Sequence, residues 1–351
     1  MRSVYEVETL LERERELATL RRLVGSASEG TGAGVLITGE AGIGKTTLVA
    51  AGCALATNAR VSVSLARAGE LESEFAWGVV RHLFAGAASD TPEDRSDWFS
   101  GAAALARPAL GVESTSSPVD ASYGTLHGLY WLTVNLAQRG PLLLAVDDLQ
   151  WADAPSLRFL THLIPRIGEL PILLLLASRP VSSDAAPAAA LVTRIAADPT
   201  LTVLRPKPLA APSSAVLVRD TLSSQATDDF CLACHETTGG NPFLLRSLLA
   251  DLAAEHVPPG PASIDHVRRM TPAAVSASVL LRLAQLDRSA LELARAVAIL
   301  GTPTELRPAR LLAGLELDQA THAAAALIRA RILHDEKGLA YVHPLVRSAA
   351  Y

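Results

Sequence analysis

The sequence predicts an α/β fold in which a parallel sheet of five strands is covered by helices. Short apolar runs recur between helical stretches, and four of them are nearly continuous in apolar residues, as strands buried on both faces are. A glycine-rich loop joins the first run to a helix, the usual place of a ligand loop in such folds. The runs are 35–38, 61–66, 142–146, 172–178 and 201–204.

Size and composition limit the class of protein. The chain has 351 residues, enough for two or three domains, and 49% are hydrophobic although only 4% are aromatic. A core of Ala, Leu and Val is therefore expected, which excludes a disordered, collagen-like or disulfide-stapled chain. The net charge of −5 gives no reason to expect nucleic-acid binding by these residues.

The same features of the sequence predict a soluble, cytoplasmic protein. The longest apolar runs, 141–146 and 171–177, fall far short of the roughly 20 residues that cross a bilayer. The N-terminus lacks an apolar signal core, and three cysteines fit a reducing compartment. We therefore expect no membrane partner.

The elements before and within the sheet follow from periodicity. Residues 10–24 place apolar side chains on one helical face, and 26–34 are a Gly/Ser linker. The run at 61–66 alternates with serines, so it is expected near an edge of the sheet. The Ala/Ser/Pro-rich stretch 182–199 is interpreted as a surface excursion.

The remainder of the chain is predicted to be helical. Residues 257–261 are the clearest linker, and two short apolar runs, 332–334 and 339–342, form a hairpin around Lys337-Gly338. Helices followed by a hairpin suggest a winged helix. The predicted domains are a nucleotide-binding domain 1–207, a helical lid 208–258 and a winged-helix domain 262–351.

The glycine-rich loop has the pattern of a phosphate-binding loop, G-x-x-x-x-G-K-[ST], after a strand and at the start of a helix. Its glycines allow backbone N–H groups to surround phosphates, and the helix N-terminus adds its positive end. Lys45 is expected to reach the β- and γ-phosphates and Thr46 to ligate Mg²⁺. The residues predicted to bind nucleotide are Gly39, Glu40, Ala41, Gly42, Ile43, Gly44, Lys45, Thr46 and Thr47.

Charged residues at the ends of two later strands complete the predicted chemistry. Asp147 and Asp148 follow an apolar strand, at the edge where open α/β sheets bind ligands. Asp147 is expected to hold Mg²⁺, and Asp148 to polarise the attacking water. Arg179 ends the next strand and is predicted to stabilise charge on the γ-phosphate.

With these residues, nearly the whole chain resembles the ATPase head of large ATP-binding LuxR-type transcriptional regulators of actinobacteria, members of the STAND class of AAA-type P-loop NTPases. The order of its motifs carries the resemblance more than the phosphate loop, which many ATPases share. Those motifs are Leu11-Glu-Arg-Glu-Arg-Glu-Leu17, Ala68-Gly-Glu-Leu-Glu-Ser-Glu-Phe-Ala76, Asp147-Asp-Leu-Gln-Trp-Ala-Asp153, Thr238-Gly-Gly-Asn-Pro-Phe-Leu-Leu245 and His343-Pro-Leu-Val-Arg347.

The resemblance implies that a lid and a winged helix close over the nucleotide and retain ADP. By position, Pro242 would pack on the adenine, His343 would touch the β-phosphate, and Arg13 would lie near the adenine. Glu12 stands where the family usually has glycine, and Pro344 where many relatives have an acid. The cofactors implied are ATP or ADP with Mg²⁺, and adenine rather than guanine rests on the resemblance alone.

Three functional classes fit these residues. The first is a nucleotide switch with slow hydrolysis, the second a multiple-turnover ATPase, and the third the same head joined to another effector such as a cyclase or kinase. The family continues into helical repeats and a DNA-binding domain, so the chain is interpreted as a truncated form ending within the winged helix. DNA would then be bound only through that absent domain, and an inducer or self-association would activate the regulator.

One motif points to different chemistry. Cys231, Cys234 and His235 match C-x-x-C-H, the pattern of covalent haem attachment. The segment has helical character and no fourth ligand for zinc nearby. Buried thiols on a lid helix are the expected outcome, rather than haem or zinc.

Overall fold

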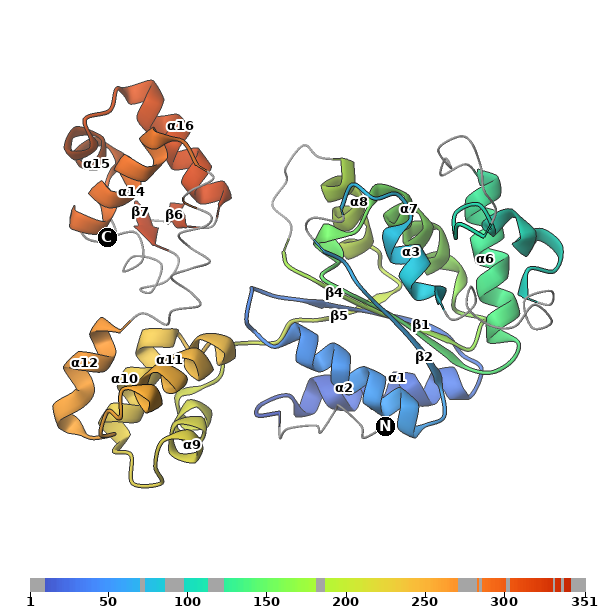
Figure 1. The fold of residues 1–351 in the computed structure, drawn as a ribbon, viewed down its shortest axis with the longest axis horizontal. Helices are drawn as coiled ribbons and strands as arrows, with labels where there is room; N and C mark the ends of the chain where they lie inside the picture. The colour runs from blue at the N-terminus through green and yellow to red at the C-terminus, as the bar shows by residue number, and fades with distance from the viewer. Residues whose placement is uncertain are drawn as a thin grey trace. The chain divides into compact units, whose positions relative to one another are not determined.

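The first unit of the chain is built on a parallel sheet (Figure 1). The strand order of this sheet is β2-β3-β4-β1-β5. This computed structural model describes residues 10–69, 73–85, 98–112, 123–180, 187–270, 283, 286–300, 304–330, 332–335 and 338–341. The chain divides into two compact units, Met1–Lys207 and Pro208–Tyr351. The predicted sheet is confirmed, with strands β1 Ala33–Thr38, β2 Ser62–Arg67, β3 Leu142–Asp147, β4 Ile172–Ser178 and β5 Leu201–Leu204.

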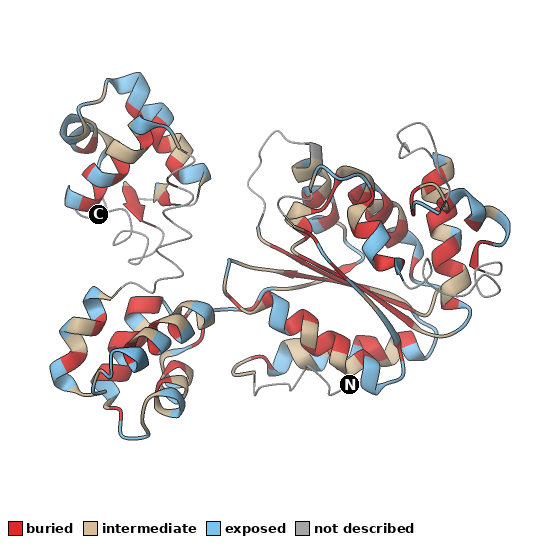
Figure 2. Ribbon diagram, in the orientation of Figure 1, coloured by how far each residue is buried: buried red, intermediate tan, exposed pale blue. Residues whose placement is uncertain are grey.

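Two layers of helices explain why the central strands are apolar throughout. Every residue of β3 and β4 is buried, as the red strands of Figure 2 show. Leu142 and Leu144 belong to one hydrophobic cluster, whereas Leu143 and Ala145 belong to another, because alternate side chains point to opposite faces. β2 is an edge strand with mostly exposed side chains, which confirms the position expected from its serines.

The helices covering the two faces of the sheet come from different parts of the chain. On one face lie α1 (Glu14–Ser28), which precedes β1 in the chain, and α2 (Lys45–Asn58), which follows it (Figure 1). On the other lie α3, η2, α6, α7 and α8, with the bounds Gly78–Leu83, Gly101–Ala106, Tyr123–Ala137, Ala154–Leu163 and Pro187–Ala196.

Two segments of this unit differ from the sequence-based expectation. The stretch 182–199, expected as a surface excursion, contains α8, whose Val192 and Ile195 are buried in the core. Ala188, Leu191, Val192 and Ile195 repeat at helical spacing, a signal that the Ala/Ser/Pro composition concealed. The expected linker 26–34 also begins too early, because α1 continues to Ser28 and buries Ala27.

The second unit begins with a helical cluster. Its members are α9 (Ala211–Thr221), α10 (Asp228–Thr238), α11 (Pro242–Ala254), η5 (Pro261–Ser263) and α12 (Ile264–Arg269). Val267 of α12 lies in the same buried core as Phe230 of α10 and Leu249 of α11. The expected linker 257–261 therefore lies inside this cluster rather than at its end, since the next helix packs back onto the helices before it.

After this cluster, the part of the chain that the structure describes forms three helices and a hairpin, the arrangement expected of a winged helix. They are α14 (Arg288–Leu300), α15 (Leu306–Ala313), α16 (Leu317–Arg329), β6 (Leu333–Asp335) and β7 (Leu339–Tyr341), and the two strands pair antiparallel. The Tyr341 hydroxyl donates to the Ala294 carbonyl, which joins the hairpin to α14. Among the described helices of both units, none has the length and apolar character needed to span a membrane.

Candidate nucleotide-binding site

The loop between β1 and α2 has the backbone that a phosphate cradle needs. Gly42 and Gly44 have positive φ angles of 81° and 100°, a region where a side chain would be strained. Gly44 is the residue before α2, so the unpaired N–H groups of the first helical turn face this loop. Together these features are those of an anion-binding site at a helix N-terminus.

Lys45 lies buried at the centre of this loop. Its Nζ donates to the carbonyl oxygens of Gly39 at 2.9 Å and Glu40 at 2.8 Å. Burial lowers its pKa, and the Arg179 charge lowers it further, whereas Asp148, Asp147 and Glu40 raise this pKa. The charged residues predicted from separate strands therefore all influence the pKa of one ammonium group.

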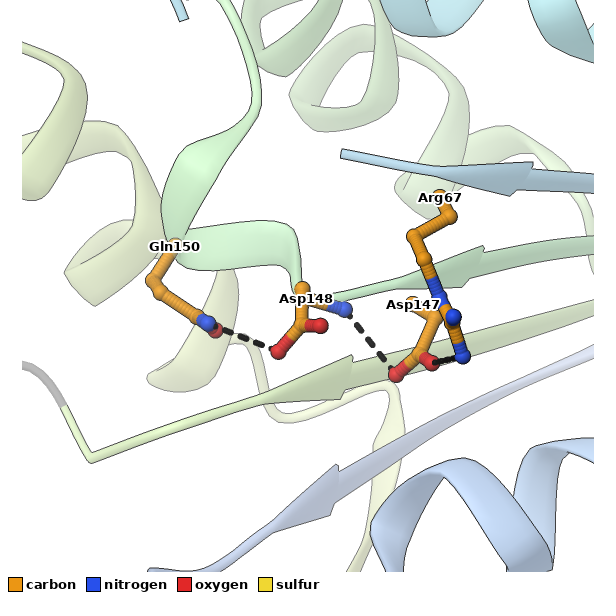
Figure 3. Close-up of polar contacts among 4 residues, drawn as sticks. All are labelled: Arg67, Asp147, Asp148 and Gln150. Carbon is orange, nitrogen blue, oxygen red and sulfur yellow. Dashed lines mark hydrogen bonds and ion pairs between the residues drawn. The ribbon is translucent and has the colours of Figure 1, made fainter. Parts of the chain in front are cut away.

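The carboxylate of Asp147 is held on both oxygens. This residue ends β3 and is buried; its Oδ1 accepts the Asp148 backbone N–H at 3.0 Å. Its Oδ2 accepts a hydrogen bond from the Arg67 guanidinium at 3.1 Å, as an ion pair (Figure 3). Arg67 ends β2 and is the register partner of Asp147. Sequence reasoning missed Arg67, because only strand pairing places it there.

Asp148 is oriented through Gln150, a second residue that sequence reasoning missed. Asp148 has a positive φ of 56°, and its Oδ1 accepts a hydrogen bond from Gln150 Nε2 at 2.9 Å (Figure 3). The Gln150 Oε1 in turn accepts the Arg179 backbone N–H at 2.9 Å and lies 3.4 Å from the Ser178 hydroxyl. A backbone held in a sparsely populated conformation by such bonds is frequent at functional sites.

The position of β4 explains why these groups meet. This strand lies between β1, which leads to the phosphate loop, and β3, which ends in Asp147. Ser178 and Arg179, at its carboxyl end, therefore stand between the loop and the acid pair. Gln150 bridges the ends of β3 and β4.

The donor set suits magnesium rather than a protein-only metal centre. Thr46 is exposed in the first turn of α2, and Thr46 and Asp147 offer hard oxygen ligands. No group of three or more His, Cys, Asp or Glu side chains in the described ranges could hold a metal ion. Mg²⁺ commonly takes one or two protein ligands and completes its shell with phosphate oxygens and water, so these residues fit it.

Arg13 lies beside the phosphate loop and is nearly fully buried. Its guanidinium donates to the carbonyls of Ile43 at 3.3 Å, Lys207 at 2.7 Å and Glu12 at 3.0 Å. Contact of Arg13 with an adenine remains a prediction. Glu12 has a positive φ of 58°, which gives a physical reason for the glycine that the resembled family carries at this position.

The Gly-Gly-Asn-Pro motif that contains Pro242 has a structural explanation of its own. Gly239 ends α10 with a φ of 59°, and a Cβ on Gly240 would lie 2.2 Å from the Leu209 carbonyl oxygen. The Asn241 side chain accepts from Phe243 and Leu244 N–H groups, and Pro242 is the first residue of α11. Pro242 is half-buried, and His343 lies outside the described residues.

The C-x-x-C-H segment lies on α10 within the helical cluster. Burial raises the pKa of Cys234 to about 12 and also raises the pKa of Cys231. The His235 Nδ1 is 2.9 Å from the buried Ser214 hydroxyl. A metal needs thiolates, so raised pKa values oppose metal binding at these cysteines.

Comparisons with known proteins agree with the fold. Residues 9–176 match the sequence profile of the AAA ATPase domain, which includes the phosphate loop and the acid pair. Over 97% of its length the chain is similar to a Walker-type ATPase of Pyrococcus abyssi, with 12% identity, a TM-score of 0.60 and 96% of that chain covered. No curated protein matches this sequence significantly.

Two further structures are similar. The ORC2 protein of Aeropyrum pernix, solved in ADPNP and ADP complexes, is 16% identical with a TM-score of 0.57, over 97% of this chain and 93% of that one. A STAND protein of Pyrococcus horikoshii with a tetratricopeptide repeat sensor is 16% identical, over 98% of this chain and 42% of that one; its TM-score of 0.44 is too low to assign a class. At these identities the likeness shows the P-loop ATPase fold.

Proposed function

We propose that the chain is a nucleotide-dependent switch that binds ATP or ADP and hydrolyses ATP slowly with Mg²⁺. One observation carries this proposal. The phosphate loop with its buried Lys45, the acid pair Asp147 and Asp148, and the cation Arg179 converge at the carboxyl edge of a single sheet. The match of 9–176 to an AAA ATPase domain supports the same chemistry.

Each residue of the site has a proposed role. The N–H groups of the loop and Lys45 would bind the phosphates; Thr46 and Asp147 would hold Mg²⁺, which neutralises phosphate charge when bound. Asp148, oriented by Gln150, would polarise the attacking water. Arg179 would stabilise charge on the γ-phosphate.

A switch and a multiple-turnover ATPase share this site and differ in how long ADP stays bound. A helical cluster followed by helices and a hairpin supports the switch, because such elements would form the lid and the winged helix of the resembled class. Pro242 and His343 are the proposed lid contacts and Arg13 the proposed contact near the adenine. The predicted domains are 1–207, 208–258 and 262–351, but α12 packs with the helices before it, so we propose that the lid extends to Arg269.

The wider biological role rests on the resemblance described above. We propose that this head regulates a bacterial, cytoplasmic transcription activator of the actinobacterial LuxR type, whose DNA-binding domain lies outside this chain. An inducer or self-association would then respond to the nucleotide state. The same head could serve another effector, such as a cyclase or kinase.

Nucleotide extraction from freshly purified protein tests the proposal. We expect near-stoichiometric ADP in the wild-type protein and none in Lys45→Ala, because the variant loses the cation at the centre of the loop. The extract is identified by chromatography. Wild-type protein that is free of nucleotide and turns over added ATP rapidly would favour the plain ATPase, whereas protein that neither holds nor binds nucleotide would contradict both.

A further inference from the structure

The ion pair between Arg67 and Asp147 joins two residues in very different surroundings. The Asp147 side chain is 3% exposed, whereas that of Arg67 is 64% exposed. Asp147 ends a fully buried strand, and one of its oxygens is already held by the Asp148 N–H. The Asp147 carboxylate is therefore fixed in place, whereas the exposed Arg67 guanidinium is the partner that can move away from the ion pair.

A buried carboxylate needs a positive neighbour, since removing its charge from water is costly. Lys45 is close enough for Asp147 to raise its pKa, but its Nζ donates to the Gly39 and Glu40 carbonyls. Among the described side chains, Arg67 is the cation that pairs directly with Asp147. It acts as the counter-ion of this carboxylate.

Asp147 is also the carboxylate proposed to hold Mg²⁺. A guanidinium and a divalent cation at the same carboxylate repel each other, so each weakens the other's hold on it. The exposed side chain of Arg67 can move into solvent when it leaves the carboxylate.

We infer that Arg67 and Mg²⁺ exchange at Asp147, and that Arg67 thereby sets the Mg²⁺ concentration that nucleotide binding requires. This inference rests on the proposed function. Arg67 is a positioning residue in this scheme, because it acts through Asp147. With Arg67 present, Asp147 keeps a counter-ion at low Mg²⁺; with Arg67 removed, the metal binds a carboxylate that has no direct cationic competitor.

The test measures the affinity of fluorescently labelled ADP by anisotropy across a Mg²⁺ titration. In Arg67→Ala we expect the half-saturating Mg²⁺ concentration to fall by about fivefold, the equivalent of one ion pair with an exposed partner. Arg67→Lys keeps the charge and should stay near the wild-type value. Asp147→Asn should remove the effect of Arg67→Ala, since both residues act at the same carboxylate.

Arg60→Ala is the matched control. Arg60 precedes β2 at its opposite end, about 20 Å from Arg67 for a six-residue strand, and it is exposed. We expect wild-type Mg²⁺ dependence for this variant, and thermal unfolding confirms that every variant is folded.

An unchanged or increased Mg²⁺ requirement in Arg67→Ala, or the same decrease in Arg60→Ala, would overturn the inference. ADP affinity that does not depend on Mg²⁺ in the wild-type protein would also overturn it. If the wild-type protein binds no ADP at any Mg²⁺ concentration, the proposed function fails and the inference fails with it. Binding with unchanged metal dependence refutes the Arg67 exchange alone.

Discussion

Replacing Asp153 by alanine should destabilise the first unit by about 4 kcal/mol. The Asp153 side chain is buried and accepts three backbone N–H groups. Trp77 donates at 2.8 Å, Ser156 at 2.9 Å and Val79 at 3.2 Å. The carboxylate thus caps α7 and holds the chain where α3 begins.

The magnitude follows from the three bonds. Losing the cap on α7 costs about 1 kcal/mol. The N–H groups of Trp77 and Val79 are buried, and each N–H left without a partner costs about 1–3 kcal/mol. For a unit of this size, 4 kcal/mol corresponds to a fall in melting temperature of about 10 °C.

Tryptophan fluorescence measures this unit separately from the other. All four tryptophans, Trp77, Trp98, Trp131 and Trp151, lie in residues 1–207. Thermal unfolding followed by their emission therefore reports the first unit, and circular dichroism reports the whole chain.

Two variants serve as comparisons. Asp153→Asn keeps one acceptor oxygen and should cost about 2 kcal/mol, since its amide nitrogen cannot accept from Val79. Asp198→Ala removes a carboxylate that accepts from Thr200 at the surface and should cost under about 1 kcal/mol. A melting temperature of Asp153→Ala within about 2 °C of wild type would refute the reasoning.

Two more predictions concern catalysis and pH. Gln150→Ala should lower kcat for ATP hydrolysis by roughly 10- to 100-fold and leave ADP affinity nearly unchanged, because Gln150 orients Asp148 but does not bind the phosphate loop. Steady-state kinetics and a binding assay measure the two quantities, and equal losses in kcat and affinity would contradict this prediction. Burial raises the pKa of Cys53 to about 11 and that of Cys234 to about 12 from an ordinary value of 9.0. Folding thus favours the protonated thiols. Their contribution to the free energy of unfolding is therefore complete below pH 9 and is lost as the pH rises toward 11 and 12. Thiol titration should show both cysteines unreactive at neutral pH until the protein unfolds; rapid labelling of native protein would disprove this.

The sequence by itself determined the features whose signal is local. The phosphate loop requires glycines at fixed spacing before a helix, and Gly42 and Gly44 adopt the positive φ angles that motivate the pattern. The apolar runs of β3 and β4 predicted strands covered on both faces, and the serines of β2 predicted an edge. The loop depends on residues that are neighbours along the chain, and the burial of each strand depends on the residue type at every second position.

Tertiary structure alone decided which side chains meet. Nothing in the spacing between Arg67 and Asp147 relates them until β2 and β3 pair in register. Gln150 became part of the site because the order of the strands places the end of β4 beside that of β3. Asp153 ends the same motif that Asp147 begins, but its carboxylate also holds the start of α3, because Trp77, 76 residues earlier in the chain, donates to it. Local patterns determine backbone conformation and burial, whereas the charge pairs of the site depend on contacts between segments distant in sequence.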